Sequence, residues 1–387
     1  MKNYFFHPSK QFVFFVVAVL SLAIWLSCEN NYQSPTEPAK TQAPVILSKD
    51  NPEVRAVMAV QNQYTEILMQ HSEVVGTATG LSADGSKPAI WVLTKIKMET
   101  ASLQKSIPVK NLVANGQIPA FIDGIPVVCY ETGELKPLRS SSTPSGHTAM
   151  QTPPIQLGTS GGWGYDLANG YCCAGTLGSL LTDGGSQYIL SNYHVLMADI
   201  VPGGNGIVAT AGDPVIQPGL IDVSCNINNA QQVASIVENW SLPGSNVDAA
   251  IAQVVPGMVR SDGAILEIGT LSAQTVDAYI GLDVKKSGRT TGLTRGTVSA
   301  LNGTVSITYE DECAGETAFT KTFTGQIIVN QKRSSFLDSG DSGSLMVEDE
   351  DSNPGAVGLL FAGSSKTAIA NPIDEVLTYF GMSMVGN

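Results

Sequence analysis

Short apolar runs separated by Gly, Pro, Asn and Asp fill the sequence from residue 155 to residue 387. This spacing is typical of an all-β barrel or sandwich. The chain contains 39 glycines and only 14% charged residues, a balance that suits strands joined by Gly-rich turns better than helical bundles. The predicted strands are Gly175–Leu181, Tyr188–Ser191, Asp248–Val255, Thr297–Leu301, Gly303–Tyr309, Gln326–Val329, Ser344–Val347 and Ala356–Phe361.

A helix signal follows these strands near the C-terminus. Asn371 is suited to cap the helix, Pro372 to occupy its first position and Gly381 to end it. The residues between them form one apolar face, made of Ile373, Val376, Leu377 and Phe380. The sequence therefore predicts a mainly β fold with a C-terminal helix.

A small α+β domain is predicted to precede the β-rich part, over residues 51–138. Apolar positions at helical spacing predict a helix from about Pro52 to His71. Strand-like runs follow at Val74–Leu81, Ile90–Thr94 and Phe121–Tyr130, and turn residues between the first two indicate a hairpin. Residues 139–154 are dominated by Ser, Thr and Pro, so they are interpreted as a linker to the domain of residues 155–387.

The N-terminus has the features of an export signal. Lys2 and Lys10 precede an apolar run over Phe12–Leu26, which is shorter than the roughly 20 residues of a membrane-spanning helix. The run ends in Trp25-Leu26-Ser27-Cys28, which resembles a bacterial lipoprotein signal, with Trp25 where that family prefers Leu or Val. The alternatives are an ordinary signal peptide and an uncleaved anchor.

The lipoprotein resemblance implies a signal peptide over residues 1–27, lipidation of Cys28 and a flexible tether over residues 28–50. The lipid would anchor the protein to a membrane of the bacterial cell envelope, on the periplasmic or cell-surface side. The net charge of −13 is the opposite of a basic stripe for nucleic acid, so we expect no nucleic-acid partner.

Of six cysteines, five follow Cys28, so at least one thiol stays free or pairs with another chain. Adjacent Cys172 and Cys173 are interpreted as one buried thiol and one outward-facing strand residue. No Cys/His cluster has the spacing of zinc ligands, and we expect neither a metal nor a cofactor.

The stretch Gly340-Asp341-Ser342-Gly343-Ser344 contains a candidate nucleophile, Ser342. A serine hydroxyl needs a base, and the base needs an orienting group. Only one of four histidines, His194, falls within the β-rich domain, at the end of a predicted strand. Asp248 opens another apolar strand, where a carboxylate requires a partner. The alternatives are a polar turn, a structural histidine and an ordinary strand-initiating aspartate.

His194, Asp248 and Ser342 follow one another in the order found in chymotrypsin. An α/β-hydrolase places a histidine after its nucleophile, and no histidine follows Ser342. Gly340 and Gly343 tolerate the dihedral angles of a tight turn. Such a turn would direct the N–H groups of Gly340 and Ser342 toward the oxyanion of an acyl-transfer reaction.

These motifs resemble the trypsin-like serine peptidases, which have the chymotrypsin fold. The resemblance rests on GDSGS at 340–344, SNYHVL at 191–196 and NVDAAIA at 246–252. The stretches 286–294, 358–364 and 369–373 are similar to a narrower bacterial group, which is related to the plant narrow-leaf protein. The resemblance covers about Gly158 to the end, and the small N-terminal domain also resembles the one that precedes the peptidase in that group.

This resemblance implies a chymotrypsin-like double β-barrel with a His194–Asp248–Ser342 triad and an oxyanion hole at Gly340 and Ser342. Two features depart from animal trypsins. Val195 follows the histidine where those enzymes have Cys, so their disulfide is absent. The newly formed N-terminus that activates a zymogen has no counterpart here.

By the same resemblance, Phe336 lies near the floor of the first substrate pocket and Gly363 on its wall. Neither is charged, so a small or apolar residue is expected before the scissile bond, although Asp338 lies close in sequence. The favoured function is an exported serine endopeptidase that acts on polypeptides. The alternative is a non-catalytic lipoprotein of this fold that binds a peptide or an envelope partner in its cleft.

Overall fold

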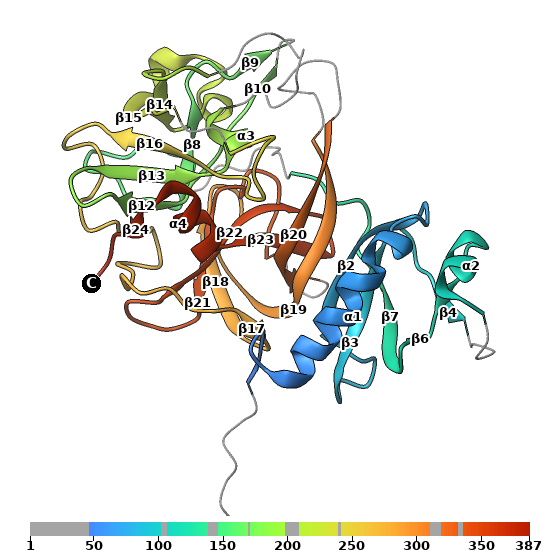
Figure 1. The fold of residues 1–387 in the computed structure, drawn as a ribbon. Coiled ribbons are helices and arrows are strands. Elements are labelled where there is room, and N and C mark those ends of the chain that lie inside the picture. The colour runs from blue at the N-terminus through green and yellow to red at the C-terminus, as the bar shows by residue number, and fades with distance from the viewer. Residues whose placement is uncertain are drawn as a thin grey trace, which may run out of the picture. The chain divides into compact units, whose positions relative to one another are not determined.

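The computed structural model describes residues 46–101, 107–137, 146–168, 171–197, 209–238, 241–309, 319–331 and 336–387. The predicted signal peptide, Cys28 and most of the predicted tether lie outside these residues. Residues 46–387 form one compact unit. Its two largest sheets both curl, as Figure 1 shows.

The first curled sheet has eight strands and is antiparallel throughout. In pairing order they are β11 (Gly175–Leu177), β8 (Thr159–Trp163), β14 (Pro214–Gln217), β15 (Gln231–Ile236), β16 (Ala250–Val254), β13 (Gln187–Ser191), β12 (Ser179–Thr182) and β24 (Ser383–Met384). Buried side chains of these strands, such as Leu180, Ile189 and Ile251, belong to the largest core cluster.

Six strands of the second, ten-stranded sheet close into a barrel. In pairing order they are β18 (Asp283–Gly288), β21 (Leu345–Glu348), β22 (Ala356–Gly363), β23 (Thr367–Pro372), β20 (Phe319–Asn330) and β19 (Gly292–Tyr309). β18 also pairs with β19, from Asp283 opposite Thr297 to Gly288 opposite Gly292, and this pairing completes the ring. The mainly β fold with two curled sheets is therefore confirmed.

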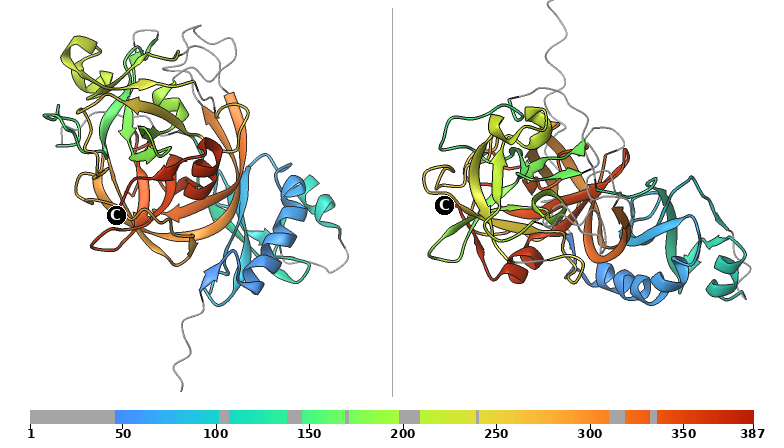
Figure 2. Two further views of the ribbon diagram at one scale, coloured as in Figure 1. Left: turned by 60° about the vertical axis from the view of Figure 1, so that its left-hand side comes forward. Right: turned by 90° about the horizontal axis from the view of Figure 1, so that it is seen from above.

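β19 also connects the barrel to the N-terminal α+β part. The two strands predicted on either side of Asn302 are one strand, with shifts of register near Gly303. β19 pairs with β2 (Val74–Leu81), and the sheet continues through β3 (Pro88–Thr94), β7 (Ile125–Glu131) and β6 (Phe121–Ile122). The α+β part thus extends the sheet of the barrel (Figure 2). The predicted domain boundary at residue 138 stays a prediction.

The first helix, α1 (Pro52–Leu68), forms where the sequence predicted one. Asn51 caps it, since its side chain accepts hydrogen bonds from the N–H groups of Glu53 (2.9 Å) and Val54 (3.3 Å). Val54, Val57 and Leu68 are buried. The helix packs along β2 and β3, as Figures 1 and 2 show.

The remaining elements are short. They are β1 (Leu47–Ser48), β4 (Thr100–Ala101), α2 (Val109–Ala114), β5 (Ile118–Pro119), β9 (Leu167–Ala168), β10 (Tyr171–Cys172), α3 (Tyr193–Leu196), η1 (Leu220–Val223), η2 (Ile227–Asn229), β17 (Tyr279–Ile280) and α4 (Ile373–Phe380). Among the described residues, no helix combines the length and apolar character needed to cross a membrane.

The C-terminal helix, α4, confirms the predicted helix but not its cap. Gly381 ends the helix with a φ of +65°. At the other end, Pro372 occupies the cap position and no side chain caps the helix. Asn371 is fully buried instead, and its amide group accepts a hydrogen bond from the N–H of Asp248 (3.0 Å). Asn371 therefore bonds to Asp248, which is distant in sequence, and does not cap the helix as predicted.

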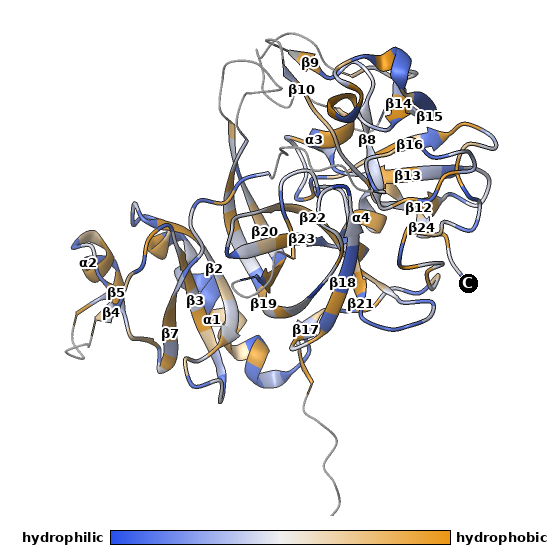
Figure 3. Cartoon of the chain, turned by 180° about the vertical axis from the view of Figure 1, so that it is seen from behind, coloured by the Kyte–Doolittle hydropathy of each residue, from blue (hydrophilic) through white to orange (hydrophobic). Residues whose placement is uncertain are grey.

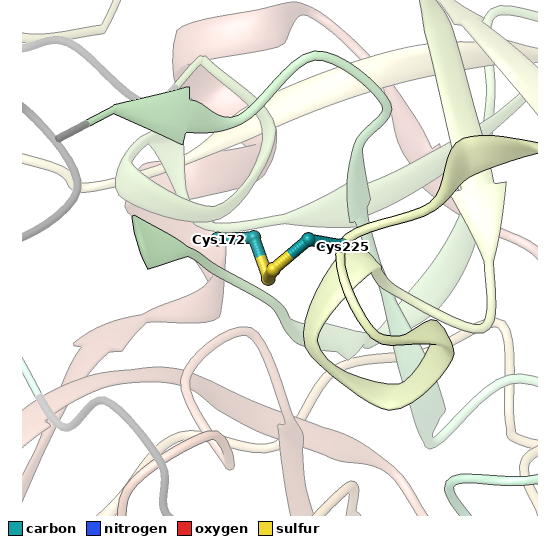
Figure 4. The surroundings of a disulfide bond; sticks show 2 residues. All are labelled: Cys172 and Cys225. Carbon is teal, nitrogen blue, oxygen red and sulfur yellow. A yellow bond between two sulfur atoms is a disulfide. The ribbon is translucent and has the colours of Figure 1, made fainter. Parts of the chain in front are cut away.

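Cys172 forms a disulfide with Cys225, between β10 and the segment that follows η1 (Figure 4). Cys173 is also disulfide-bonded. The interpretation of this pair as a buried thiol beside an outward-facing residue is therefore wrong, because both sulfurs are oxidised. Cys129, on β7, is a free cysteine.

We expect Gln61 to be essential for docking α1 on the sheet. Its buried amide donates to Thr77 Oγ1 (3.1 Å) and to the carbonyl of Asn302 (2.9 Å), and it accepts from Thr79 Oγ1 (2.8 Å). Gln61→Leu leaves these groups unpaired and should lower the free energy of unfolding by about 1–3 kcal/mol in urea titrations. The exposed Gln63→Leu should change it by less than about 0.5 kcal/mol. Equal effects of the two changes would contradict this role.

Candidate active site

The structure brings His194 and Asp248 into direct contact. His194 lies on α3, immediately after β13, and Asp248 lies two residues before β16, the strand that pairs with β13. The Nδ1 atom of His194 is 2.7 Å from Oδ2 of Asp248. Both residues are buried, with exposed fractions of 4% and 0%. The neighbouring strands of the first sheet therefore hold the histidine and the carboxylate together.

Four donors converge on the carboxylate of Asp248. Oδ1 accepts the N–H groups of Tyr193 (2.8 Å) and His194 (3.3 Å), and Oδ2 accepts from His194 Nδ1 and from the Tyr309 hydroxyl (2.7 Å). Burial of an unpaired carboxylate would be costly, and these donors replace its water. A carboxylate at Nδ1 holds the proton there and leaves Nε2 as the acceptor.

The backbone of Asp248 is held as firmly as its side chain. Its N–H donates to Asn371, and its carbonyl accepts from the side chain of Asn192 at 2.7 Å. Asn192, Tyr309 and Asn371 were not identified from the sequence as partners of Asp248. The only sequence feature that pointed to Asn192 was its position directly before Tyr193 and His194.

Ser342 lies in two consecutive tight turns between Asp338 and Ser344. The N–H of Asp341 donates to the carbonyl of Asp338 (3.0 Å), and the N–H of Ser344 donates to the carbonyl of Asp341 (2.9 Å). Gly340 and Gly343 both have a φ of +92°. A Cβ atom at Gly343 would also come within 2.3 Å of the Thr176 carbonyl. These positions require glycine, as the sequence indicated.

β11 brings the Ser342 turn next to the segment that contains His194. The N–H of Thr176 donates to the carbonyl of Ser342 (2.8 Å), and the Ser191 hydroxyl donates to the carbonyl of Thr176 (2.7 Å). A Cβ atom at Gly175 would lie 2.9 Å from the Ser342 carbonyl and 2.5 Å from the side chain of Val195. β11 therefore contacts both the Ser342 turn and the segment that contains His194.

The Ser342 hydroxyl donates a long hydrogen bond, of 3.4 Å, to the carbonyl of Phe361 on β22. Nε2 of His194 is buried and has no hydrogen-bond partner within the part of the chain that the structure describes. A base-to-nucleophile hydrogen bond is thus not formed here. In the absence of substrate, such bonds are often loose and tighten in the reacting complex.

A buried cation supports the Ser342 turn. The Asp341 carboxylate accepts the N–H groups of Asp338, Thr290 and Thr291, and Lys286 Nζ lies 3.2 Å from its Oδ2. Lys286 is fully buried on β18, a strand that Figure 3 shows as largely hydrophilic. Burial lowers the pKa of Lys286, and the Asp341 carboxylate counteracts this.

The Lys286–Asp341 pair was not predicted. Adjacent Lys285 and Lys286 in a strand place one lysine on each face, so the sequence signalled that one of them points inward. Asp341 has this built-in cation, and the arrangement does not require a newly cleaved N-terminus. The acidic residues 348–351, at and after the end of β21, include Asp349, which forms a more exposed ion pair with Arg295 at 3.0 Å.

The two candidate pocket residues lie in different surroundings. Phe336 is fully buried in the core of the closed barrel, against Val329 and Gly296. Gly363 ends β22, and its main chain is hydrogen-bonded to Lys136. His147, in the predicted linker, is buried as well, with Nε2 3.0 Å from both Ser287 Oγ and Glu267 Oε2. The roles of Phe336 and Gly363 in a pocket stay predictions.

The chain thus combines a mainly β fold of two curled sheets with a buried His–Asp pair and a serine on a glycine turn. Residues 245–371 match the family model of the Nal1 C-terminal domain, which confirms the resemblance to the narrow-leaf group. No curated protein sequence matches the chain.

Solved serine proteases are similar to the chain in structure at low identity. A glutamic acid specific serine protease is 20% identical over 59% of this chain and 100% of its own, with a TM-score of 0.39. Thermobifida fusca protease A is 19% identical over 60% and 99%, with a TM-score of 0.39. Cellulomonas bogoriensis chymotrypsin is 20% identical over 55% and 91%, with a TM-score of 0.34.

Removal of the buried cation should destabilise the fold strongly. Lys286→Met leaves the Asp341 carboxylate buried without its cation and should lower the free energy of unfolding by about 3–5 kcal/mol. As a control, Arg295→Met breaks the more exposed pair with Asp349 and should cost less than about 1 kcal/mol. Urea titrations of both variants measure this difference. A loss at Lys286 no larger than at Arg295 would mean that the cation is dispensable.

Proposed function

We propose that this chain is a serine endopeptidase that hydrolyses peptide bonds through an acyl-enzyme. The observation that carries the proposal is the buried His194–Asp248 pair beside Ser342. Four donors fix the carboxylate against Nδ1 of His194, the position from which a carboxylate stabilises a charged imidazole. The alternative, a peptide-binding protein, has no need for a histidine nitrogen buried without a partner.

In the proposed mechanism, Nε2 of His194 takes the proton of the Ser342 hydroxyl as its oxygen attacks the peptide carbonyl. Asp248 holds the Nδ1 proton and stabilises the imidazolium. The N–H groups of Gly340 and Ser342 bind the oxyanion, and loss of one such donor typically slows catalysis on the order of 10²–10³-fold. His194 then protonates the leaving amine.

The second half of the reaction repeats these roles with water. His194 takes a proton from water, the hydroxide attacks the acyl carbonyl, and His194 returns the proton to Ser342 Oγ as the acid leaves. We propose a polypeptide substrate with a small or apolar residue before the scissile bond, because Phe336 and Gly363 supply no charge for Lys or Arg. Preferential cleavage of a peptide panel after Lys or Arg would overturn this preference.

Labelling by a fluorophosphonate probe tests the proposal, because the probe reacts with activated serines. The parent chain should be labelled, and Ser342→Ala should not. Ser339→Ala, in the same loop, is the matched control and should be labelled like the parent. Labelling that persists in Ser342→Ala would reject Ser342 as the nucleophile and point to another activated serine. A parent that stays unlabelled would favour the binding protein.

We also propose that the protein is exported and lipidated at Cys28. The disulfides at Cys172 and Cys173 support this location, because disulfides persist in oxidising compartments. A lipid at the end of a tether would place the site near the membrane surface of the cell envelope.

Metabolic labelling with a radioactive fatty acid tests the anchor. The wild-type chain expressed in a bacterium should incorporate the label and fractionate with membranes. Cys28→Ala should lose the label, while Cys129→Ala, which changes the free thiol on β7, should keep it. A labelled Cys28→Ala variant would contradict lipidation at this residue.

A further inference from the structure

The segment Thr132–Pro137, directly after β7, pairs with the end of β22. The N–H of Lys136 donates to the carbonyl of Gly363 (3.2 Å), and the N–H of Gly363 donates to the carbonyl of Lys136 (2.9 Å). The two residues form an antiparallel bridge. We propose that this segment occupies the substrate-binding edge of the cleft and restrains the enzyme in cis, an inference that rests on the proposed function.

The edge of β22 leads directly to Ser342. β21 pairs with β22 up to Leu359, which lies opposite Leu345. Two residues further on, the carbonyl of Phe361 accepts the Ser342 hydroxyl, and two residues beyond that Gly363 bonds to Lys136. β22 is bulged between Leu360 and Ala362, and β23 pairs with its opposite edge as far as Gly363. The Ser342 turn and Lys136 therefore both meet the edge of β22 along which β21 runs.

An extended polypeptide binds a sheet edge by adding a strand, through main-chain hydrogen bonds of this kind. An added strand would bond to the N–H and the carbonyl of Gly363, and the bridge to Lys136 already uses both of these groups. A substrate that extends along β22 from Ser342 would meet Gly363 already paired. The occupant in cis must therefore leave before a substrate of this length can bind.

Other contacts join the segment to β19 as well. The carbonyl of Leu135 accepts the N–H of Thr308 (3.3 Å), and the Leu135 side chain is only 2% exposed. Thr308 directly precedes Tyr309, the partner of Asp248. Directly before the segment, Glu131 at the end of β7 forms an ion pair with Lys366 (2.5 Å). The segment thus lies between the strands that contact Asp248 and Ser342.

The test is a proline that removes one hydrogen bond. Lys136→Pro deletes the N–H that bonds to Gly363, and Lys136→Ala is the matched control because it removes the side chain and keeps the N–H. Using fluorescein-labelled casein and the full chain, we expect Lys136→Pro to raise kcat/KM at least about tenfold, mainly through KM. Lys136→Ala should stay within about twofold of the parent. Because the proline variant could misfold, Lys366→Ala, which removes the ion pair with Glu131, should also raise kcat/KM.

The same changes in a Ser342→Ala background separate this inference from the proposed function, because casein binding is then read by fluorescence anisotropy without hydrolysis. Tighter binding to the proline variant, with no hydrolysis by any Ser342 form, would keep the inference and reject the endopeptidase. Hydrolysis that is equal in the parent and in every folded variant would keep the endopeptidase and overturn the inference. Equal casein binding across the Ser342→Ala forms would overturn it as well.

Discussion

The buried carboxylate of Asp248 is the interaction on which the arrangement of the site depends. Its partners come from both halves of the structure: Tyr193 and His194 lie on α3, directly after β13 of the first sheet, whereas Tyr309 and Asn371 lie on β19 and β23 of the second. Because a buried carboxylate must have donors, the same carboxylate joins the two sheets and orients the imidazole of His194.

A second buried carboxylate, that of Asp341, fixes the position of the serine turn, as the carboxylate of Asp248 fixes the position of the histidine. Three N–H groups and the Lys286 ammonium surround the Asp341 carboxylate and so stabilise the turn. β18 supplies this lysine and also closes the barrel against β19. The cation is thus part of the folded barrel, which accounts for a serine turn that is ordered in the intact chain. The restraint that we propose lies elsewhere, at the edge of β22 near Gly363.

Much of the fold could be predicted from local patterns. The helix after Asn51, the strand succession from residue 155 and the C-terminal helix all depend on periodicity, caps and turn residues that neighbours in sequence provide. The candidate site residues were chosen for a similar reason, because a histidine, an aspartate and a glycine-flanked serine follow a recognisable order; the structure brings His194 and Asp248 into contact, and their role in catalysis stays a prediction. The errors lie where a tertiary contact replaced a local one. Asn371 binds Asp248 rather than capping α4, and Cys172 pairs with Cys225.

The sequence by itself determined most of the elements that form and which side chains are candidates for the acyl transfer that we propose. Only the tertiary structure decided what surrounds them: Tyr309 and Asn371 on Asp248, Lys286 under Asp341, and Lys136 on the edge of β22. These contacts join residues far apart in the chain, with separations of 61 and 123 residues for the two partners of Asp248. Several of them, including the bridge to Gly363, use main-chain groups that every residue possesses, so no residue type marks them in a sequence.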